Sequence, residues 1–344
     1  MMTREPAPAR LVNDGRIRFG MFDGPVREPN LLDAHAPLGV RLPRVIQALR
    51  LKEWQAIQLG NGRFFVLVAL FHAKTMALAQ IKVFDRKTGE KRLFERKLPP
   101  WSFDVAQGLC GTATTWESRG ARLSFDNRFD QGTLELSVDI PAGRKSPRMH
   151  GRVQIDVAAA ESVVVSLPFD ENRGMYSHKG CFPCSGRLQV GDDCIEFGEE
   201  GGFCLLDDHK GFYPYVMKWD WVTGARVEGQ RVAFNLTRND NTQPQRWNEN
   251  ALFMDGRIHH LPPVTFERHG EGPGEHWLVR DEQGRVDVRF DVVLDGRVTV
   301  NALIAESRYR GPFGDFSGTL EPEGGPAVTV DGAFGMGEQF YLRT

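Results

Sequence analysis

Apolar and polar residues alternate with a period of two through most of this chain, while stretches with the 3.6-residue period of an amphipathic helix are nearly absent. Because successive side chains of a strand point to opposite faces, this pattern predicts half-buried β-strands. Asp-Gly and similar pairs separate the alternating segments and suit two-residue hairpin turns, so antiparallel pairing is expected. The segments predicted as strands include 75–85, 122–127, 132–140, 152–157, 162–167, 231–236, 286–293, 297–304 and 333–342.

Short helices are expected only at 43–51 and near 207–211. A chain of this length accommodates roughly 18 to 20 strands, more than one small sheet holds without curling or splitting. We therefore predict an all-β fold of two tandem antiparallel β-barrels or strongly curved sheets. The polar stretch 168–173 follows an apolar segment near the midpoint of the chain. It predicts an N-terminal arm at 1–30, a first barrel-like domain at 31–172 and a second at 173–344.

Charge and hydropathy exclude several classes of protein. With 43 Lys and Arg against 45 Asp and Glu, the net charge is −2 and gives no overall attraction for nucleic acid. The longest apolar run, 64–71, is far shorter than the roughly 20 residues of a membrane helix. Charges and prolines occupy the first residues, where a secretory signal would be apolar. A cytoplasmic protein without a membrane span or a nucleic-acid partner is expected.

Five cysteines are too few and too unevenly spaced for a disulfide framework in a chain of 344 residues. Cys181 and Cys184 form a CxxC pair, which can bind a metal or form a redox couple, or simply place two small half-buried residues in a turn. No second CxxC accompanies it, so the turn is favoured and no metal is expected. GxGxxG, Walker, HExxH and GxSxG motifs are absent, and no cofactor is expected.

Several segments, taken together and in order, resemble one known family. They are LRLKEWQA near the N-terminus and then MYSHKGCFPCSG, DDHKGFYPYVMKWDWVTG, NLTRNDNTQPQRWNENALFMDGRIHHLPPVTF, YRGPFGDFSGTL and FGMGEQFYLR. This set is similar to the bacterial family called domain of unknown function 2804, over nearly the whole chain. That family resembles the calycin, or lipocalin-like, tandem barrels of carotenoid 1,2-hydratase and tocopherol cyclase. The resemblance implies two barrels with cavities for apolar molecules, and it implies no particular reaction.

Alternation in 213–222 gathers aromatic side chains on one face of a predicted strand: Tyr213, Tyr215, Trp219 and Trp221, with Met217. Flat rings can line a pocket for polyenes or ring systems and stabilise a developing carbocation. The same face can equally be plain core. These four aromatic residues are therefore candidates for ligand binding.

Glu338 is the candidate catalytic residue because its strand face otherwise reads Phe334, Met336, Phe340 and Leu342. Burial disfavours the charged form of a carboxyl group, which would suit a general acid. Pairing with a buried Arg or Lys, or a face that contacts a partner, are the structural alternatives. Asp220 is a second candidate acid, although it shares a face with Lys218 and a solvated ion pair is its simplest role.

Polar candidates for ligand contacts are His178, Asn248 and Asn250. His178 lies upstream of Asp207, Asp208 and His209, and this set can support a metal, acid–base chemistry or a hydrogen-bonded turn. Asn248 and Asn250 share a strand face, where either can orient a polar ligand group or support the adjacent turn.

The leading hypothesis is a protein that binds an apolar or amphipathic small molecule in a β-barrel cavity, as a cofactor-independent hydratase, cyclase or isomerase of isoprenoid-like substrates. A non-catalytic carrier or sensor of hydrophobic ligands is the first alternative. A carbohydrate-processing β protein, which requires paired carboxylates beside an aromatic groove, is the second. The sequence leaves the oligomeric state open.

Overall fold

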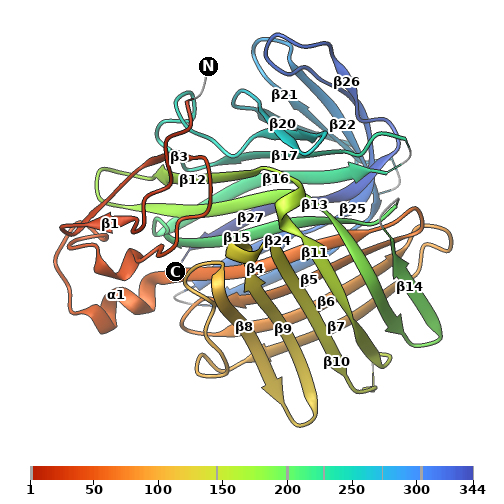
Figure 1. The fold of residues 1–344 in the computed structure, drawn as a ribbon, viewed down its shortest axis with the longest axis horizontal. Helices are drawn as coiled ribbons and strands as arrows, with labels where there is room; N and C mark the ends of the chain where they lie inside the picture. The colour runs from red at the N-terminus through yellow and green to blue at the C-terminus, as the bar shows by residue number, and fades with distance from the viewer. Residues whose placement is uncertain are drawn as a thin grey trace. The chain divides into compact units, whose positions relative to one another are not determined.

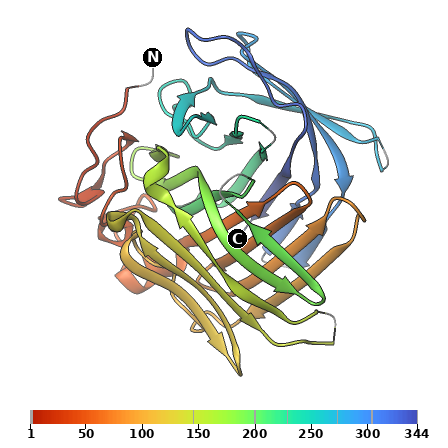
Figure 2. The ribbon, with the colours of Figure 1, turned by 45° about the vertical axis from the view of Figure 1, so that its right-hand side comes forward.

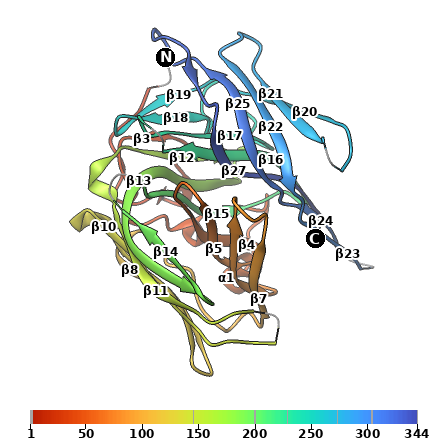
Figure 3. The same cartoon turned by 90° about the vertical axis from the view of Figure 1, so that its right-hand side faces the viewer.

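The computed structural model describes residues 3–144, 146–198, 201–227, 229–272, 274–302 and 305–343. Over these residues the chain is almost entirely β, and the prediction of an all-β fold is confirmed (Figure 1). A 13-stranded and a 12-stranded antiparallel sheet account for nearly all of the described strands. Each sheet is strongly curved, as the turned views in Figure 2 and Figure 3 show. Each predicted strand overlaps an observed one, although residues 303 and 304 of the segment 297–304 lie outside the described residues.

The chain forms two compact units. The N-terminal unit comprises Arg4–Ser166 and Asn172–Phe212, and the C-terminal unit consists mainly of Tyr213–Thr344 with the short segment Leu167–Glu171. The boundary expected at 172/173 therefore differs from the observed division. β15 (Phe203–Phe212) pairs with β4 (Leu51–Gly60) and with β13 (Gly174–Val190), and these long-range ladders hold it in the N-terminal unit.

The sheet of the N-terminal unit has the strand order β7-β6-β5-β4-β15-β13-β11-β10-β9-β8, with β14 (Asp193–Phe197) paired to β13. Its apolar core includes Ile57, Phe125, Leu136 and Leu206, all nearly inaccessible. The rings of Phe94 on β7 and Trp116 on β8 lie 5.8 Å apart, so side chains meet where the two ends of the sheet curl together. The remaining strands are β5 (Phe64–His72), β6 (Ala77–Asp85), β7 (Lys91–Leu98), β8 (Cys110–Ser118), β9 (Ala121–Arg128), β10 (Thr133–Ile140) and β11 (Met149–Asp156).

The N-terminal residues from Arg4 onward belong to this unit rather than forming a separate arm. β3 (Gly20–Phe22) pairs with β12 (Ser162–Pro168), while β1 (Val12–Asn13) pairs with β2 (Arg16–Ile17). Leu11, Phe22 and Val26 are buried in a second apolar cluster together with residues of β4, β13 and β15. This cluster anchors the N-terminal segment to the sheet.

In the part of the chain that the structure describes, helix is confined to short pieces. α1 (Arg44–Arg50) matches the helix expected at 43–51, and single 3-10 turns occur at η1 (Leu31–Asp33), η2 (Phe129–Gln131) and η3 (Val157–Ala159). The helix expected near 207–211 was wrong, because those residues belong to β15 and pair on both sides with β4 and β13. Among the described residues, no helix is long and apolar enough to cross a membrane.

The C-terminal unit is built on the order β19-β18-β17-β16-β27-β25-β22-β21-β20. Val222, Phe234, Trp277, Phe290 and Phe316 lie in its buried core. The strands are β16 (Val216–Arg226), β17 (Val232–Asn239), β18 (Ala251–Met254), β19 (Arg257–His260), β20 (Thr265–His269), β21 (His276–Arg280), β22 (Val286–Leu294), β23 (Arg297–Ala302), β24 (Ala305–Arg310), β25 (Phe313–Leu320), β26 (Val328–Thr329) and β27 (Ala333–Arg343).

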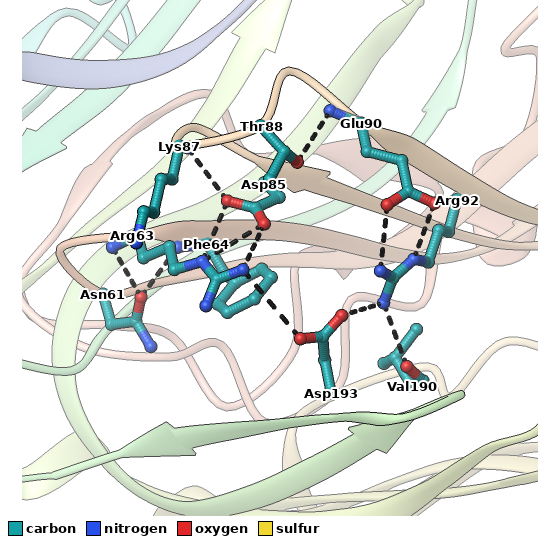
Figure 4. A network of polar contacts seen from close by, with 10 residues as sticks. All are labelled: Asn61, Arg63, Phe64, Asp85, Lys87, Thr88, Glu90, Arg92, Val190 and Asp193. Atoms are coloured by element: carbon teal, nitrogen blue, oxygen red, sulfur yellow. Dashed lines mark hydrogen bonds and ion pairs between the residues drawn. The ribbon is translucent and has the colours of Figure 1, made fainter.

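A polar network ties together strands that are not neighbours in the sheet of the N-terminal unit (Figure 4). Arg63, beside β5, holds Asp85 at the end of β6 through contacts of 2.6 to 3.1 Å, and this hydrogen bonding lowers the pKa of Asp85 to about 2. Arg92 on β7 donates to the Val190 carbonyl at 3.0 Å and contacts Asp193 at 2.5 Å. The network therefore joins the β5–β7 strands to the β13–β14 hairpin.

Candidate functional site

The strongest candidate site lies on β16 and β27 of the C-terminal unit, which pair with Trp219 opposite Phe340 and Trp221 opposite Glu338. The core side of β27 is identified by Gly337, where a Cβ would lie 2.7 Å from the Trp277 ring. Because Glu338 is the next residue, its side chain lies on the face opposite the Trp277 ring, a face on which Phe334 and Met336 are buried as well. This face carries Phe334, Met336, Glu338 and Phe340, as the alternation predicts.

Two aromatic side chains donate hydrogen bonds to the half-buried Glu338. The Trp219 indole Nε1 donates to Oε2 at 3.0 Å, and the Tyr309 hydroxyl donates to Oε1 at 2.8 Å. Hydrogen bonds donated to a carboxylate stabilise its charged form, so this geometry suits a base or a charge stabiliser better than the neutral acid expected from the sequence. Sequence reasoning missed Tyr309, because its place beside Phe340 depends on the pairing of β24 with β27.

Aromatic rings lie beside the carboxylate. The Trp219 and Phe340 rings lie 4.1 Å apart with 27° between their planes, and Tyr309 lies 6.1 Å from Phe340. Tyr213 is buried 6.3 Å from Trp219. We call Tyr213, Trp219, Tyr309, Glu338 and Phe340 the aromatic–carboxylate cluster.

The other two aromatic candidates differ from this cluster. Trp221 is buried and donates to Asn235 Oδ1 at 2.6 Å, so a protein group engages its indole nitrogen. Tyr215 lies outside β16 and is 58% exposed. Pro214 has no N–H to extend a ladder, and the regular alternation starts only at Val216. The shared aromatic face is therefore shorter than predicted.

Asp220 lies opposite Gln339, on the other face of the sheet from Glu338. Its carboxylate pairs with the Arg268 guanidinium at 2.5 Å, rather than with Lys218 as considered from the sequence. Asp220 and Glu338 therefore do not flank one ligand, and they do not form the carboxylate pair required by a carbohydrate-processing site.

Asn248 and Asn250 are buried beside the turn before β18, and both amides bond to backbone. Asn250 accepts from the Thr237 N–H at 2.7 Å and donates to the Pro262 carbonyl at 2.9 Å. Asn248 accepts from the Asn250 N–H and donates to the Pro244 carbonyl. These hydrogen bonds stabilise the turn and the adjacent strand pairing.

His178 belongs to the N-terminal unit, on β13 opposite Asp208 of β15. It is fully buried, with the Phe129 ring edge-on at 5.0 Å, and among the described residues neither ring nitrogen has a hydrogen-bond partner. Burial, helped by the nearby Lys210 charge, lowers the pKa of His178 to about 3. Its imidazole is therefore neutral near pH 7, beside a buried Lys210–Asp208 ion pair of 2.7 Å.

Strand alternation separates the set formed by His178, Asp207, Asp208 and His209, because Asp207 and His209 occupy the opposite face of β15. There Lys179 contacts Asp207 at 2.6 Å, and the Trp54 ring stacks on His209 at 4.5 Å. Burial opposes ionisation of Asp207, yet Lys179 and His209 hold its pKa well below the usual range.

Ser177, His209 and Asp207 resemble a serine–histidine–aspartate triad in composition only. His209 Nε2 lies 3.0 Å from Ser177 Oγ and also 3.1 Å from Asp207 Oδ1. A triad uses one ring nitrogen for the nucleophile and the other for the carboxylate. The shared nitrogen therefore argues against a nucleophilic serine here.

Cys181 and Cys184 both lie within β13 rather than in a turn. Residues three apart on a regular strand point to opposite faces, unlike the two thiols of a CxxC turn. All five cysteines are thiols in the structure, and burial raises the pKa of Cys204 well above its ordinary value. Within the described ranges, no group of three or more His, Cys, Asp or Glu side chains is placed to hold a metal ion.

Two strongly curved antiparallel sheets in one chain define a tandem, barrel-like all-β protein. The chain belongs to the family described as domain of unknown function (DUF2804), whose profile matches residues 3–343. No protein with a curated description is similar enough in sequence to count as a match.

Solved structures of similar fold include CghA with Sch210972, which has a TM-score of 0.53 and 15% identity over 85% of this chain and 88% of that chain. CghA alone gives the same TM-score at 14% identity. Kievitone hydratase from Nectria haematococca has a TM-score of 0.43 and 12% identity, over 85% and 89% of the two chains. At these identities the likeness to CghA shows the fold alone.

Proposed function

We propose that this chain binds an apolar or amphipathic small molecule against the aromatic–carboxylate cluster and catalyses its hydration, cyclisation or isomerisation without a cofactor. The observation that carries this proposal is a carboxylate held beside the stacked rings of Trp219 and Phe340. Aromatic faces bind rings and conjugated chains, and they stabilise positive charge. CghA, which shares the fold, has been solved with Sch210972, and this supports a small organic ligand.

Glu338 and Tyr309 are the residues assigned to the chemistry. In an isomerisation, the Glu338 carboxylate takes a proton from one substrate carbon and returns it to another, so no co-reactant is consumed. In a hydration, one water molecule adds across a double bond and its proton passes through the same group. The Tyr309 hydroxyl, 2.8 Å from Oε1, keeps the carboxylate oriented. We also propose that the protein is cytoplasmic and has no nucleic-acid partner. Its net charge of −2 gives no overall attraction for nucleic acid.

The test begins with native mass spectrometry of the purified full chain, which identifies molecules that copurify with it. Those molecules, together with a panel of isoprenoid, fatty acyl and polyketide compounds, are then incubated with the protein and analysed for products. We expect Glu338→Gln to bind the ligand and to lose about 10²- to 10⁴-fold in turnover. Asp220→Asn, on the other sheet face, is the matched carboxylate control and should retain both ligand binding and turnover. Loss of turnover in Asp220→Asn with activity kept in Glu338→Gln would contradict the assignment.

A non-catalytic carrier is the second candidate, and a specific observation favours it. Both oxygens of Glu338 already accept hydrogen bonds from the protein, as expected of a carboxylate that anchors two aromatic side chains. A carrier would release its ligand with an unchanged mass after prolonged incubation. In that case Glu338→Gln and Tyr309→Phe would weaken ligand binding, because each removes a contact that fixes the rings.

A further inference from the structure

The outward face of α1 is apolar, the reverse of an ordinary surface helix. Val45, Ile46 and Leu49 are 74%, 45% and 48% exposed, whereas the polar Gln47 is buried and donates to the Leu42 carbonyl. At about 100° of rotation per residue, the three exposed side chains fall within an arc of roughly 100°. The helix therefore presents a compact apolar stripe to the surroundings.

Arginines flank this stripe. The same rotation places Arg44 on one side of the arc and Arg50 on the other, and the exposed Arg41 precedes the helix. The segment 34–52 contains no Asp or Glu. Arg44 pairs with Asp33 yet keeps 67% of its side chain exposed. An apolar face bordered by basic residues is typical of a helix that lies in the interface of an anionic membrane.

A second apolar element lies at the same end of the N-terminal unit. Trp101, in the loop after β7, is 83% exposed. This loop is fixed to the end of β5, because His72 lies 2.7 Å from the Pro100 carbonyl and packs edge-on against Phe103. His72 pairs with Glu53 of β4, three residues after the end of α1. Tryptophan is enriched where protein meets the lipid headgroups.

We propose that Val45, Ile46, Leu49 and Trp101, with Arg41, Arg44 and Arg50, form a docking surface for an anionic lipid membrane, and we call these seven residues the α1 surface. The helix of seven residues is too short to span a bilayer, so it lies along the headgroup region. A protein that binds apolar small molecules and docks on a membrane has direct access to molecules dissolved in the lipid. The docking itself does not depend on the proposed ligand site.

The test is cosedimentation of the full-length chain with vesicles of phosphatidylcholine alone and of phosphatidylcholine mixed with phosphatidylserine. We expect binding to the mixed vesicles that weakens as salt is raised, because the arginine contribution is electrostatic. Ile46→Gln/Leu49→Gln should weaken binding at least tenfold, and Arg41→Gln should reduce its salt dependence. The matched control is Leu93→Gln/Val293→Gln, which changes two apolar residues of 37% and 51% exposure outside the α1 surface.

Three outcomes would overturn the proposal: no binding to either vesicle, an equal loss in the control pair, or binding that ignores phosphatidylserine. Analytical ultracentrifugation without vesicles distinguishes membrane docking from self-association of the chain. If the wild type is a dimer that Ile46→Gln/Leu49→Gln dissociates, the surface belongs to a second copy of the chain.

Trp101→Phe retains an aromatic ring and should remove any lipid-induced blue shift of fluorescence due to Trp101. Glu338→Gln should bind vesicles normally, so failure of the ligand site and failure of the docking surface remain distinguishable.

Discussion

His178 shows at the scale of one residue how burial decides chemistry. Its side chain is fully buried on the core-facing side of β13, and neither ring nitrogen is hydrogen-bonded among the described residues. An unpaired buried imidazole is tolerated only in its neutral form, since charging it would require desolvating a cation beside Lys210. Folding and protonation of this residue therefore oppose each other.

We predict that this opposition makes stability depend on pH between about 3 and 6.5, the folded and ordinary pKa values of His178. In this window the unfolded chain binds a proton that the folded chain does not, so the free energy of unfolding rises with pH. Urea denaturation of the wild type and His178→Gln across this range measures the difference. The variant should show the smaller slope, and parallel curves for the two proteins would contradict the assignment.

At the scale of elements, the network in Figure 4 compensates for a ladder that the sheet does not form. β7 is at one end of the strand order and pairs only with β6 among the described strands, yet Arg92 links it to Asp193 and Val190 of the β13–β14 hairpin. The arginine side chain is 20% exposed and that of Asp193 is 28% exposed, so water screens this contact less than an open surface pair. These side chains thereby join β7 to the β13–β14 hairpin, although no backbone ladder forms between them among the described strands.

We expect Arg92→Gln to lower the free energy of unfolding by about 1 kcal/mol, the usual net contribution of one intramolecular hydrogen bond. Hydrogen exchange should rise in the β13–β14 hairpin and in β7, because the link between them is lost. Arg122→Gln is the control, since its partner Glu117 and Arg122 itself are both more than half exposed. Equal destabilisation by the two substitutions would mean that the Arg92 contacts stabilise the protein no more than an exposed ion pair does.

At the scale of the whole molecule, strands distant in sequence complete each unit. The N-terminal segment adds β3 to β12, β13 pairs with β11, and β15 pairs with β4. Phe22 is inaccessible within the cluster that these segments share. The N-terminal unit therefore depends on contacts that span almost its entire length.

Phe22→Ala should accordingly destabilise the protein by about 3 to 5 kcal/mol, the usual cost of removing a buried phenylalanine side chain. Val40→Ala, at a residue 58% exposed, should change the free energy of unfolding by less than about 0.5 kcal/mol. Chemical denaturation followed by intrinsic fluorescence measures both. A small effect at Phe22 would mean that the N-terminal residues behave as the partly extended arm expected from the sequence.

Local pattern alone determined the strand content and the parity of side chains along each strand. Phe334, Met336, Glu338 and Phe340 share a face because alternation is a property of the extended backbone, whatever it pairs with. The same reasoning placed Trp219 and Trp221 together and predicted turns at the Asp-Gly pairs. It also predicted two curved sheets, since this many strands exceed one small sheet.

Tertiary structure alone decided which strands became neighbours and which face became core. Tyr309 reaches Glu338 because β24 pairs with β27, and Asp207 lies in a strand because β4 and β13 flank it. The division at Phe212 rather than near 172 follows from the same long-range ladders. Alternation identifies two faces without saying which is buried, because burial depends on strand partners that are distant in sequence rather than on local periodicity.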